Sequence, residues 1–129
     1  MFKLASRVIK ILLVGFLLNP LIAQGDSEQR RCDIGPLKKA YGRTNWLVYS
    51  CSDEKTLIFV SDAGSPVMPF VFALILRGDE YELSGEGATS RRDLTGAAFD
   101  EIKILSKLEI DKMINLTKKI KASEADSGK

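Results

Sequence analysis

The stretch Phe70-Val71-Phe72-Ala73-Leu74-Ile75-Leu76 decides the fold. It is an unbroken apolar run, bounded by the turn-forming residues 62–66 and 77–80. A short apolar run between turns, rich in aromatic and β-branched residues, predicts a β-strand. The run does not alternate apolar and polar side chains, as a strand with one face in water should. The sequence therefore predicts a sheet that is apolar on both faces at this strand.

Several coverings of the second face are consistent with this pattern. A second copy of the chain or a partner protein covers it, or the sheet curls enough to enclose both faces. Alternatively, the strand is central, and its own long side chains and an N-terminal helix cover it.

Neighbouring segments supply the rest of the sheet. Residues 46–51 and 56–61 are rich in β-branched and aromatic residues and predict two earlier strands, and residues 81–84 alternate as a fourth. The connections are too short for the crossover that parallel strands need. We therefore expect a four-stranded antiparallel meander.

A short helix is expected before the sheet. Residues 33–36, Asp-Ile-Gly-Pro, offer a helix start with Pro36 in the first turn. Residues 37–41 would form the helix, and Gly42 suits its C-terminal cap.

Two helices are expected after the sheet. Ala98, Ile102 and Leu105 form one helical stripe, in a helix that begins near Thr95. Residues 106–109, Ser-Lys-Leu-Glu, have the form of a capping box and start a second helix, although one long helix is the alternative. The apolar face of the second helix comprises Ile110, Met113, Ile114, Thr117 and Ile120. The predicted fold is α+β: a short N-terminal helix, a four-stranded antiparallel meander and two C-terminal helices packed on the sheet.

The N-terminus has the pattern of an export signal. Lys3, Arg7 and Lys10 precede an apolar run, residues 11–18, and a small residue, Ala23, offers a cleavage point. These are the three parts of a signal peptide, and the run is too short to cross a bilayer. An uncleaved anchor or a buried core helix are the alternatives.

This interpretation divides the chain into four parts. They are a signal peptide (1–23), a disordered leader (24–31), a single domain (32–122) and a frayed tail (123–129). The protein is then periplasmic or secreted, and has no membrane contact after cleavage.

Removing the signal also changes the charge balance. The whole chain has 19 basic and 17 acidic residues, and three of the basic ones lie in the signal. The remaining domain is nearly neutral and lacks the clustered Lys and Arg of a nucleic-acid binder. Nucleic acid is therefore not an expected partner.

Cys32 and Cys51 are the only cysteines. An even pair in an exported chain predicts a disulfide. Closing a loop of about 20 residues stabilises by about 3 kcal/mol in the chain-entropy model. The spacing is not that of a redox CxxC pair, and without histidine a zinc site is not expected.

Catalytic arrangements are missing from the sequence. The absence of histidine excludes Ser–His–Asp and Cys–His catalysis, and no phosphate-binding glycine motif is present. The adjacent carboxylates 53–54 and 79–80 lie in predicted turns, where solvated charge is usual. We expect a protein that is not an enzyme and holds no cofactor or metal.

One loop is a candidate binding site. It joins the last strand to a helix and contains glycines, which leave backbone amides accessible, and two arginines. Backbone amides and guanidinium groups can both bind a carboxylate or phosphate. An ordinary flexible connection is the alternative. The candidate residues are Ser84, Gly85, Gly87, Ser90, Arg91 and Arg92.

Residues 49–57, Tyr-Ser-Cys-Ser-Asp-Glu-Lys-Thr-Leu, resemble a segment of the small periplasmic inhibitors of c-type lysozyme, in which Tyr-x-Cys ends a strand. Ser84-Gly85 resembles their inhibitory Ser-Gly, but the aromatic residue that follows in that family is missing, and the C-terminal helices are foreign to its barrel. No site residue is transferred. The expected function is a non-catalytic exported protein that binds a partner or forms a homodimer through the apolar sheet face. The alternative is an inhibitor of a cell-wall hydrolase such as lysozyme.

Overall fold

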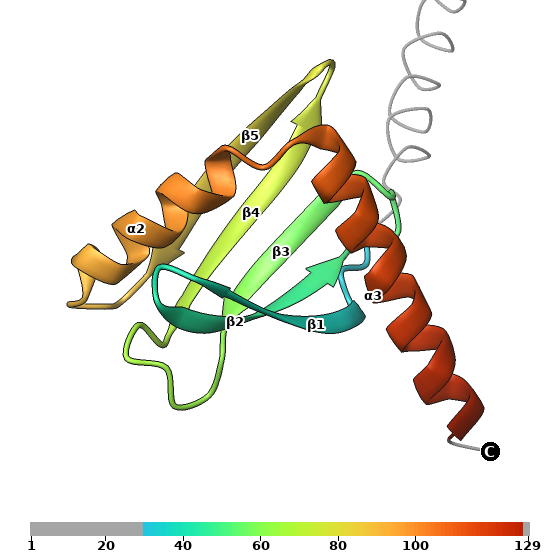
Figure 1. Cartoon of the computed structure of the whole chain (residues 1–129), viewed down its shortest axis with the longest axis horizontal. Coiled ribbons are helices and arrows are strands. Elements are labelled where there is room, and N and C mark those ends of the chain that lie inside the picture. Colours follow the sequence, from blue (N-terminus) through green and yellow to red (C-terminus); the bar gives the residue numbers. More distant parts are fainter. Residues whose placement is uncertain (1–29, 128–129) are drawn as a thin grey trace, which may run out of the picture.

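The computed structural model describes residues 30–127. The predicted signal peptide and residues 24–29 of the predicted leader lie outside this range. Five strands form one antiparallel sheet in chain order, and two helices follow them (Figure 1). The elements are β1 (Ile34–Tyr41), β2 (Thr44–Ser50), β3 (Thr56–Ser61), β4 (Phe70–Arg77), β5 (Glu80–Gly87), α2 (Arg92–Lys103) and α3 (Lys107–Ser127). The α+β class is confirmed, but the sheet has five strands where four were predicted.

The predicted N-terminal helix is wrong, because residues 37–41 belong to β1. β1 pairs with β2 from Ile34 to Tyr41, with one register shift between Ile34 and Leu37. A five-residue helix is too short to be stable by itself, whereas pairing with β2 gives each residue a partner in the sheet.

Gly42 closes a β-hairpin and does not cap a helix. Gly42 and Arg43 both have positive φ, 58° and 61°, which is the backbone of a two-residue type I′ turn. A side chain at Gly42 would also lie 2.4 Å from the carbonyl oxygen of Leu94, so α2 packs directly on this turn. Glu101 of α2 accepts a hydrogen bond from the Gly42 amide at 2.9 Å.

The C-terminal region forms two helices. Ser106 and Glu109 make both bonds of the capping box: the Glu109 amide donates to Ser106 Oγ at 3.1 Å, and the Ser106 amide donates to Glu109 Oε2 at 2.9 Å. This box starts α3, which continues to Ser127.

The predicted disulfide between Cys32 and Cys51 is present. It joins the residues just before β1 to the end of β2. Next to it, Ser52 exchanges hydrogen bonds with the backbone of Arg31, at 2.7 and 3.1 Å. The bridge thus fixes the start of the edge strand β1 to the end of the neighbouring strand β2.

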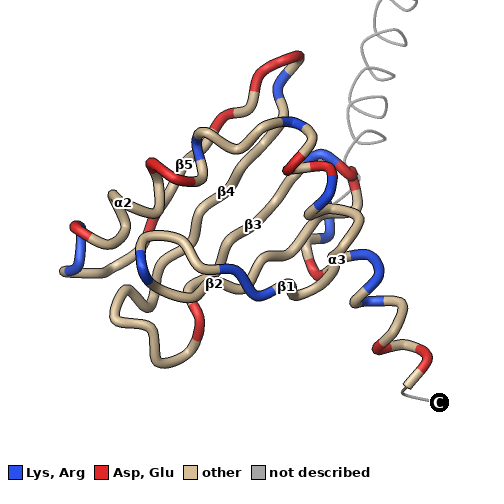
Figure 2. Tube along the Cα trace, in the orientation of Figure 1, with Lys and Arg blue, Asp and Glu red and all other residues tan. Residues whose placement is uncertain are grey.

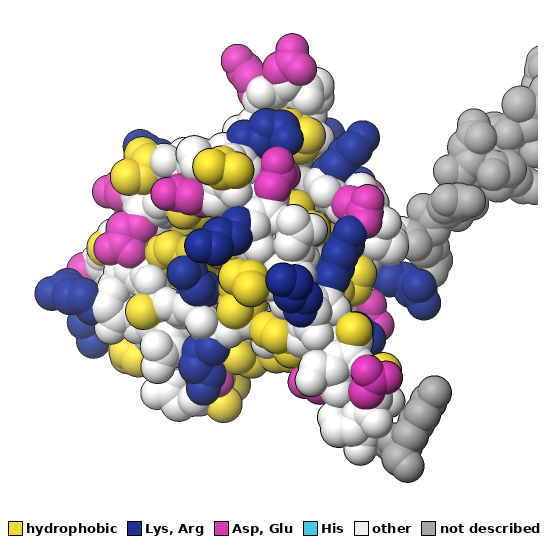
Figure 3. Space-filling model, turned by 45° about the vertical axis from the view of Figure 1, so that its right-hand side comes forward, with side chains coloured by type: hydrophobic (Ala, Val, Ile, Leu, Met, Phe, Trp, Pro, Cys, Tyr) yellow, Lys and Arg dark blue, Asp and Glu magenta, His cyan; other side chains and the backbone are white. Residues whose placement is uncertain are grey.

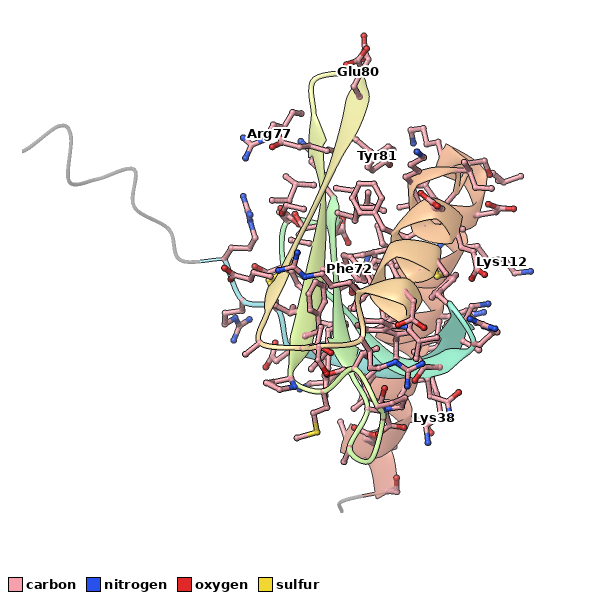
Figure 4. The ribbon with its side chains drawn as sticks, turned by 90° about the vertical axis from the view of Figure 1, so that its left-hand side faces the viewer. Lys38, Phe72, Arg77, Glu80, Tyr81 and Lys112 are labelled. Atoms are coloured by element: carbon pink, nitrogen blue, oxygen red, sulfur yellow. A yellow bond between two sulfur atoms is a disulfide. The ribbon has the colours of Figure 1, made fainter. Side chains whose placement is uncertain are left out.

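One core lies between the sheet and both helices. Figure 4 views the sheet along its edge and shows the helices on the same side of it. Trp46 is fully buried and donates from Nε1 to the carbonyl oxygen of Tyr41 at 3.0 Å. The buried polar pair Ser50 and Thr117 joins β2 to α3, with their hydroxyl oxygens 2.7 Å apart. The core residues are Tyr41, Trp46, Val48, Leu57, Phe59, Val67, Phe72, Leu74, Leu94, Ala98, Ile102, Ile110, Met113 and Ile114.

Within residues 30–127, no helix has the length and apolar character needed to cross a membrane.

Candidate functional site: the helix-free sheet face

The sheet has a second apolar face that carries no helix. Along the middle of β2, β3 and β4, the side chains that alternate with the core residues are again hydrophobic, and they are half-buried. We call this surface the helix-free face. Its residues are Leu47, Tyr49, Ile58, Val60, Val71, Ala73 and Ile75.

The register of the strands makes this surface continuous. Ile58 lies between Tyr49 of β2 and Ala73 of β4, and Val60 lies between Leu47 and Val71. Arg77, at the end of β4, extends from this side of the sheet, away from the helices (Figure 4). Because residues 37–41 form a strand, the alternative in which an N-terminal helix covers this face is wrong, and no other helix of the described chain covers it.

Two hollows shape the helix-free face. One of about 360 Å³ lies beside Val60, Met68, Pro69 and Val71, and the Met68 side chain at its rim is 54% exposed. The other, of about 210 Å³, lies over the small side chains of Ala73 and Ser84. An apolar surface with hollows of this size is typical of a binding surface.

The candidate loop is mostly not a loop. Ser84, Gly85 and Gly87 belong to β5, which is twice as long as the four residues predicted, and they pair with β4 along its length. Ser90 lies in the connection, and Arg92 is the first residue of α2. Sequence reasoning missed this because Gly85 and Gly87 look like turn residues, whereas the rings of Phe70 and Phe72 cover Gly85 and stabilise it in the strand.

Arg91 is engaged with a carboxylate. Its Nε and Nη2 atoms donate to the two oxygens of Asp93 at 3.1 and 3.0 Å. This paired hydrogen bond raises the pKa of Arg91 and is the main cause of the lowered pKa of Asp93. An anionic ligand would have to compete with Asp93 for this guanidinium.

Gly85, Gly87 and Arg92 do line a common hollow, of about 410 Å³, between β5 and α2. Its walls also include the rings of Phe70, Phe72 and Phe99. Because three aromatic rings line it, the hollow suits an apolar group better than a phosphate. The anion site at residues 84–92 stays a prediction.

The adjacent carboxylates Asp53 and Glu54 have structural partners. Asp53 accepts hydrogen bonds from the amides of Lys55 and Thr56, and Glu54 pairs with Lys118 of α3. Over the described part of the chain, no cluster of three or more His, Cys, Asp or Glu residues has the arrangement of a metal site.

Charge is unevenly distributed over the sheet edges. Acidic residues mark β5 and the tip of the β4–β5 hairpin, basic residues mark β1, and α3 carries residues of both signs (Figure 2). Figure 3 shows Lys and Arg side chains spread among hydrophobic ones over the middle of one face, with acidic side chains projecting at the top. Glu80, at this hairpin tip, is labelled in Figure 4.

Comparison with known proteins assigns neither a family nor a function to this chain. No protein-family model, no curated protein and no solved structure matches this chain.

Proposed function

We propose that the protein is exported, to the periplasm or out of the cell, and acts there without catalysis by binding a partner through the helix-free face. The N-terminal pattern of basic residues, short apolar run and small residue supports export. The disulfide between Cys32 and Cys51 is consistent with an oxidising compartment.

The single observation that carries the proposal is a continuous apolar surface on the side of the sheet opposite the core. Antiparallel sheets with one covered face normally present polar side chains on the other. Here the exposed side of three adjacent strands carries seven apolar residues, and contiguous apolar patches of this kind mark interaction surfaces.

Site-specific photocrosslinking in the organism that makes the protein tests this surface. A benzoylphenylalanine replaces Ile58, on the helix-free face, or Ile104, which is 76% exposed at the end of α2 and serves as the matched control. We expect a discrete crosslinked product from position 58 and none from position 104. Equal products from both positions, or none from either, would contradict the proposal.

The inhibitor hypothesis makes a different prediction. An inhibitor inserts a protruding loop into an enzyme cleft, but Ser84 and Gly85 lie within a regular strand. We therefore favour the binding protein. Lysozyme assayed with an excess of the purified protein should keep its lytic activity, and a stoichiometric loss of activity would restore the inhibitor hypothesis.

A further inference from the structure

β5 is an open edge of the sheet. It pairs with β4 in unbroken register, from Phe70 with Gly87 to Arg77 with Glu80, and no described strand pairs with its other side. It is also the most exposed of the five strands. An edge strand presents a row of backbone donors and acceptors to which another strand can pair.

The register defines which backbone groups are free. Arg77 and Glu80 flank a two-residue turn, so they exchange both of their backbone hydrogen bonds, and every second pair along the ladder does the same. Glu82, Ser84 and Glu86 therefore direct their backbone groups at β4. The alternate residues of β5, Tyr81, Leu83, Gly85 and Gly87, direct theirs outward.

The opposite edge, β1, is protected. It contains Pro36, a register shift after Ile34 and the adjacent Lys38 and Lys39, and α3 packs against it. Natural sheets use prolines, bulges and lysines to prevent unwanted pairing at an edge. β5 has none of these three features.

The charge of β5 discriminates between partners. Glu80, Glu82 and Glu86 share the side of β5 that continues the helix-free face, and Glu82 pairs there with Arg77 of β4. Antiparallel pairing of two copies about Leu83 would set Glu80 opposite Glu86, and pairing about Ser84 would set Glu82 opposite Glu86. Because like charges directly opposite destabilise a sheet, a second copy fits poorly and a basic strand fits well.

The hollow between β5 and α2 adds a second recognition element. It lies on the helix side of β5, next to Gly85 and Gly87, where the rings of Phe70 and Phe72 pack directly on the glycine backbone. A residue of an added strand on that side would have the rings of Phe70, Phe72 and Phe99 within reach. Strand addition commonly combines main-chain bonds with pockets for alternate side chains in this way.

We propose that β5 binds an extended segment of a partner protein, which adds to the sheet as a sixth strand. The segment alternates basic residues, opposite Glu80, Glu82 and Glu86, with apolar residues, one of which is bulky and enters the hollow beside Gly85. This proposal goes beyond the helix-free face, because it concerns the backbone of a different part of the sheet and holds whether or not that face binds anything.

Peptide titration followed by amide NMR tests the proposal on the oxidised protein, purified after export of the full chain. The probe is a capped octapeptide that alternates lysine and valine, with one central valine replaced by phenylalanine. We expect the largest shifts at the amides of residues 80–87, and binding about tenfold weaker for the same peptide with glutamate in place of lysine. The amides of alternate peptide residues can be N-methylated in two patterns, on the odd or on the even residues. Methylation of the residues whose amides pair with β5 should abolish binding, and methylation of the others should leave binding intact.

A pair of charge variants makes the test specific. The double variant Glu80→Lys and Glu86→Lys should bind the lysine peptide about fivefold to tenfold more weakly and the glutamate peptide more tightly. Glu124→Lys together with Asp126→Lys, on the exposed end of α3, makes the same change in net charge and should alter neither affinity.

Four results would overturn the proposal. They are no binding at millimolar peptide, shifts confined to the helix-free face, equal affinity for both peptides, and a dimer of the protein alone that is joined through β5. A negative crosslink at position 58 together with a positive titration would reject the proposed function and leave this proposal standing.

Discussion

Asp53 fixes the turn between β2 and β3. Its Oδ1 accepts from the amides of Lys55 and Thr56 at 2.9 and 3.1 Å, its Oδ2 accepts from the Thr56 hydroxyl at 2.8 Å, and Arg30 Nε lies 3.0 Å from Oδ2. Burial alone would raise the pKa of Asp53, but these hydrogen bonds and the charge of Arg30 together lower it from 3.8.

We expect Asp53→Ala to lower the free energy of unfolding by about 1–2 kcal/mol at pH 7, because the turn loses three hydrogen bonds at a partly exposed site. Because the pKa of Asp53 is lower in the folded state than in the unfolded state, ionised Asp53 stabilises the folded protein at pH values above its unfolded-state pKa. This stabilisation is lost as the pH falls through its folded-state pKa. Urea unfolding at pH 7 and pH 3 should therefore show a smaller difference between the two proteins at pH 3. Asp79→Ala, in an exposed turn, is the control and should unfold like the parent at both pH values.

Tyr41 is a core residue whose ionisation makes the stability of the fold depend on pH in the alkaline range. Its ring packs edge-on against Phe59, and its hydroxyl donates to the sulfur of Met113 at 3.5 Å. Burial, followed by the negative charges of Glu109 and Glu101, raises the pKa of Tyr41 from 10.0 to about 12.

Between pH 10 and 12 the unfolded chain therefore loses this phenolic proton first, and the contribution of Tyr41 to stability falls. We expect a loss of about 1–2 kcal/mol over this interval, measured by urea unfolding at successive pH values. Other groups titrate in the same range, so the informative quantity is the difference from Tyr41→Phe. Parallel pH profiles for the two proteins would show that Tyr41 makes no such contribution.

Among the secondary-structure elements, α3 depends on its first turn. The reciprocal bonds of Ser106 and Glu109 occupy two backbone amides at the start of the helix. Ser106→Ala should lower the free energy of unfolding by about 1 kcal/mol, measured by urea denaturation at neutral pH. Ser90→Ala, which changes an exposed serine in the connection before α2, should have no measurable effect.

The elements that the sequence predicted correctly are those with local signals. β3 has the predicted bounds, and the capping box starts a helix one residue later. Both depend on residues a few positions apart. The second apolar face was also foreseeable, because residues 70–76 do not alternate.

β1 was mispredicted, and β5 was predicted at only half its length, because their conformation depends on distant partners. Residues 37–41 have no strong preference of their own and follow β2 through the Gly42-Arg43 turn. Gly85 and Gly87 discourage a strand prediction, yet they accommodate the rings and backbone of the Phe70 region. The pairing of Arg91 with Asp93 similarly required the geometry of the helix start.

In the molecule as a whole, one sheet has two apolar faces in different environments. Two adjacent residues of β3 lie on opposite faces: Leu57 is fully buried under the helices, and Ile58 lies on the helix-free face. Leucine and isoleucine are isomers, so truncating each to alanine removes the same number of carbon atoms. The two variants therefore compare the stability that each face contributes when the same number of carbon atoms is removed.

Leu57→Ala should lower the free energy of unfolding by about 2–5 kcal/mol, because it leaves a cavity in the core. Ile58→Ala should cost less than about 1.5 kcal/mol, since its side chain already contacts solvent and leaves no enclosed cavity. Urea unfolding at micromolar protein measures both. If Ile58→Ala costs as much as Leu57→Ala, the helix-free face is already covered in the isolated protein and cannot be the surface that receives a partner. A cost for Ile58→Ala that rises with protein concentration would instead identify a second copy of the chain as the covering.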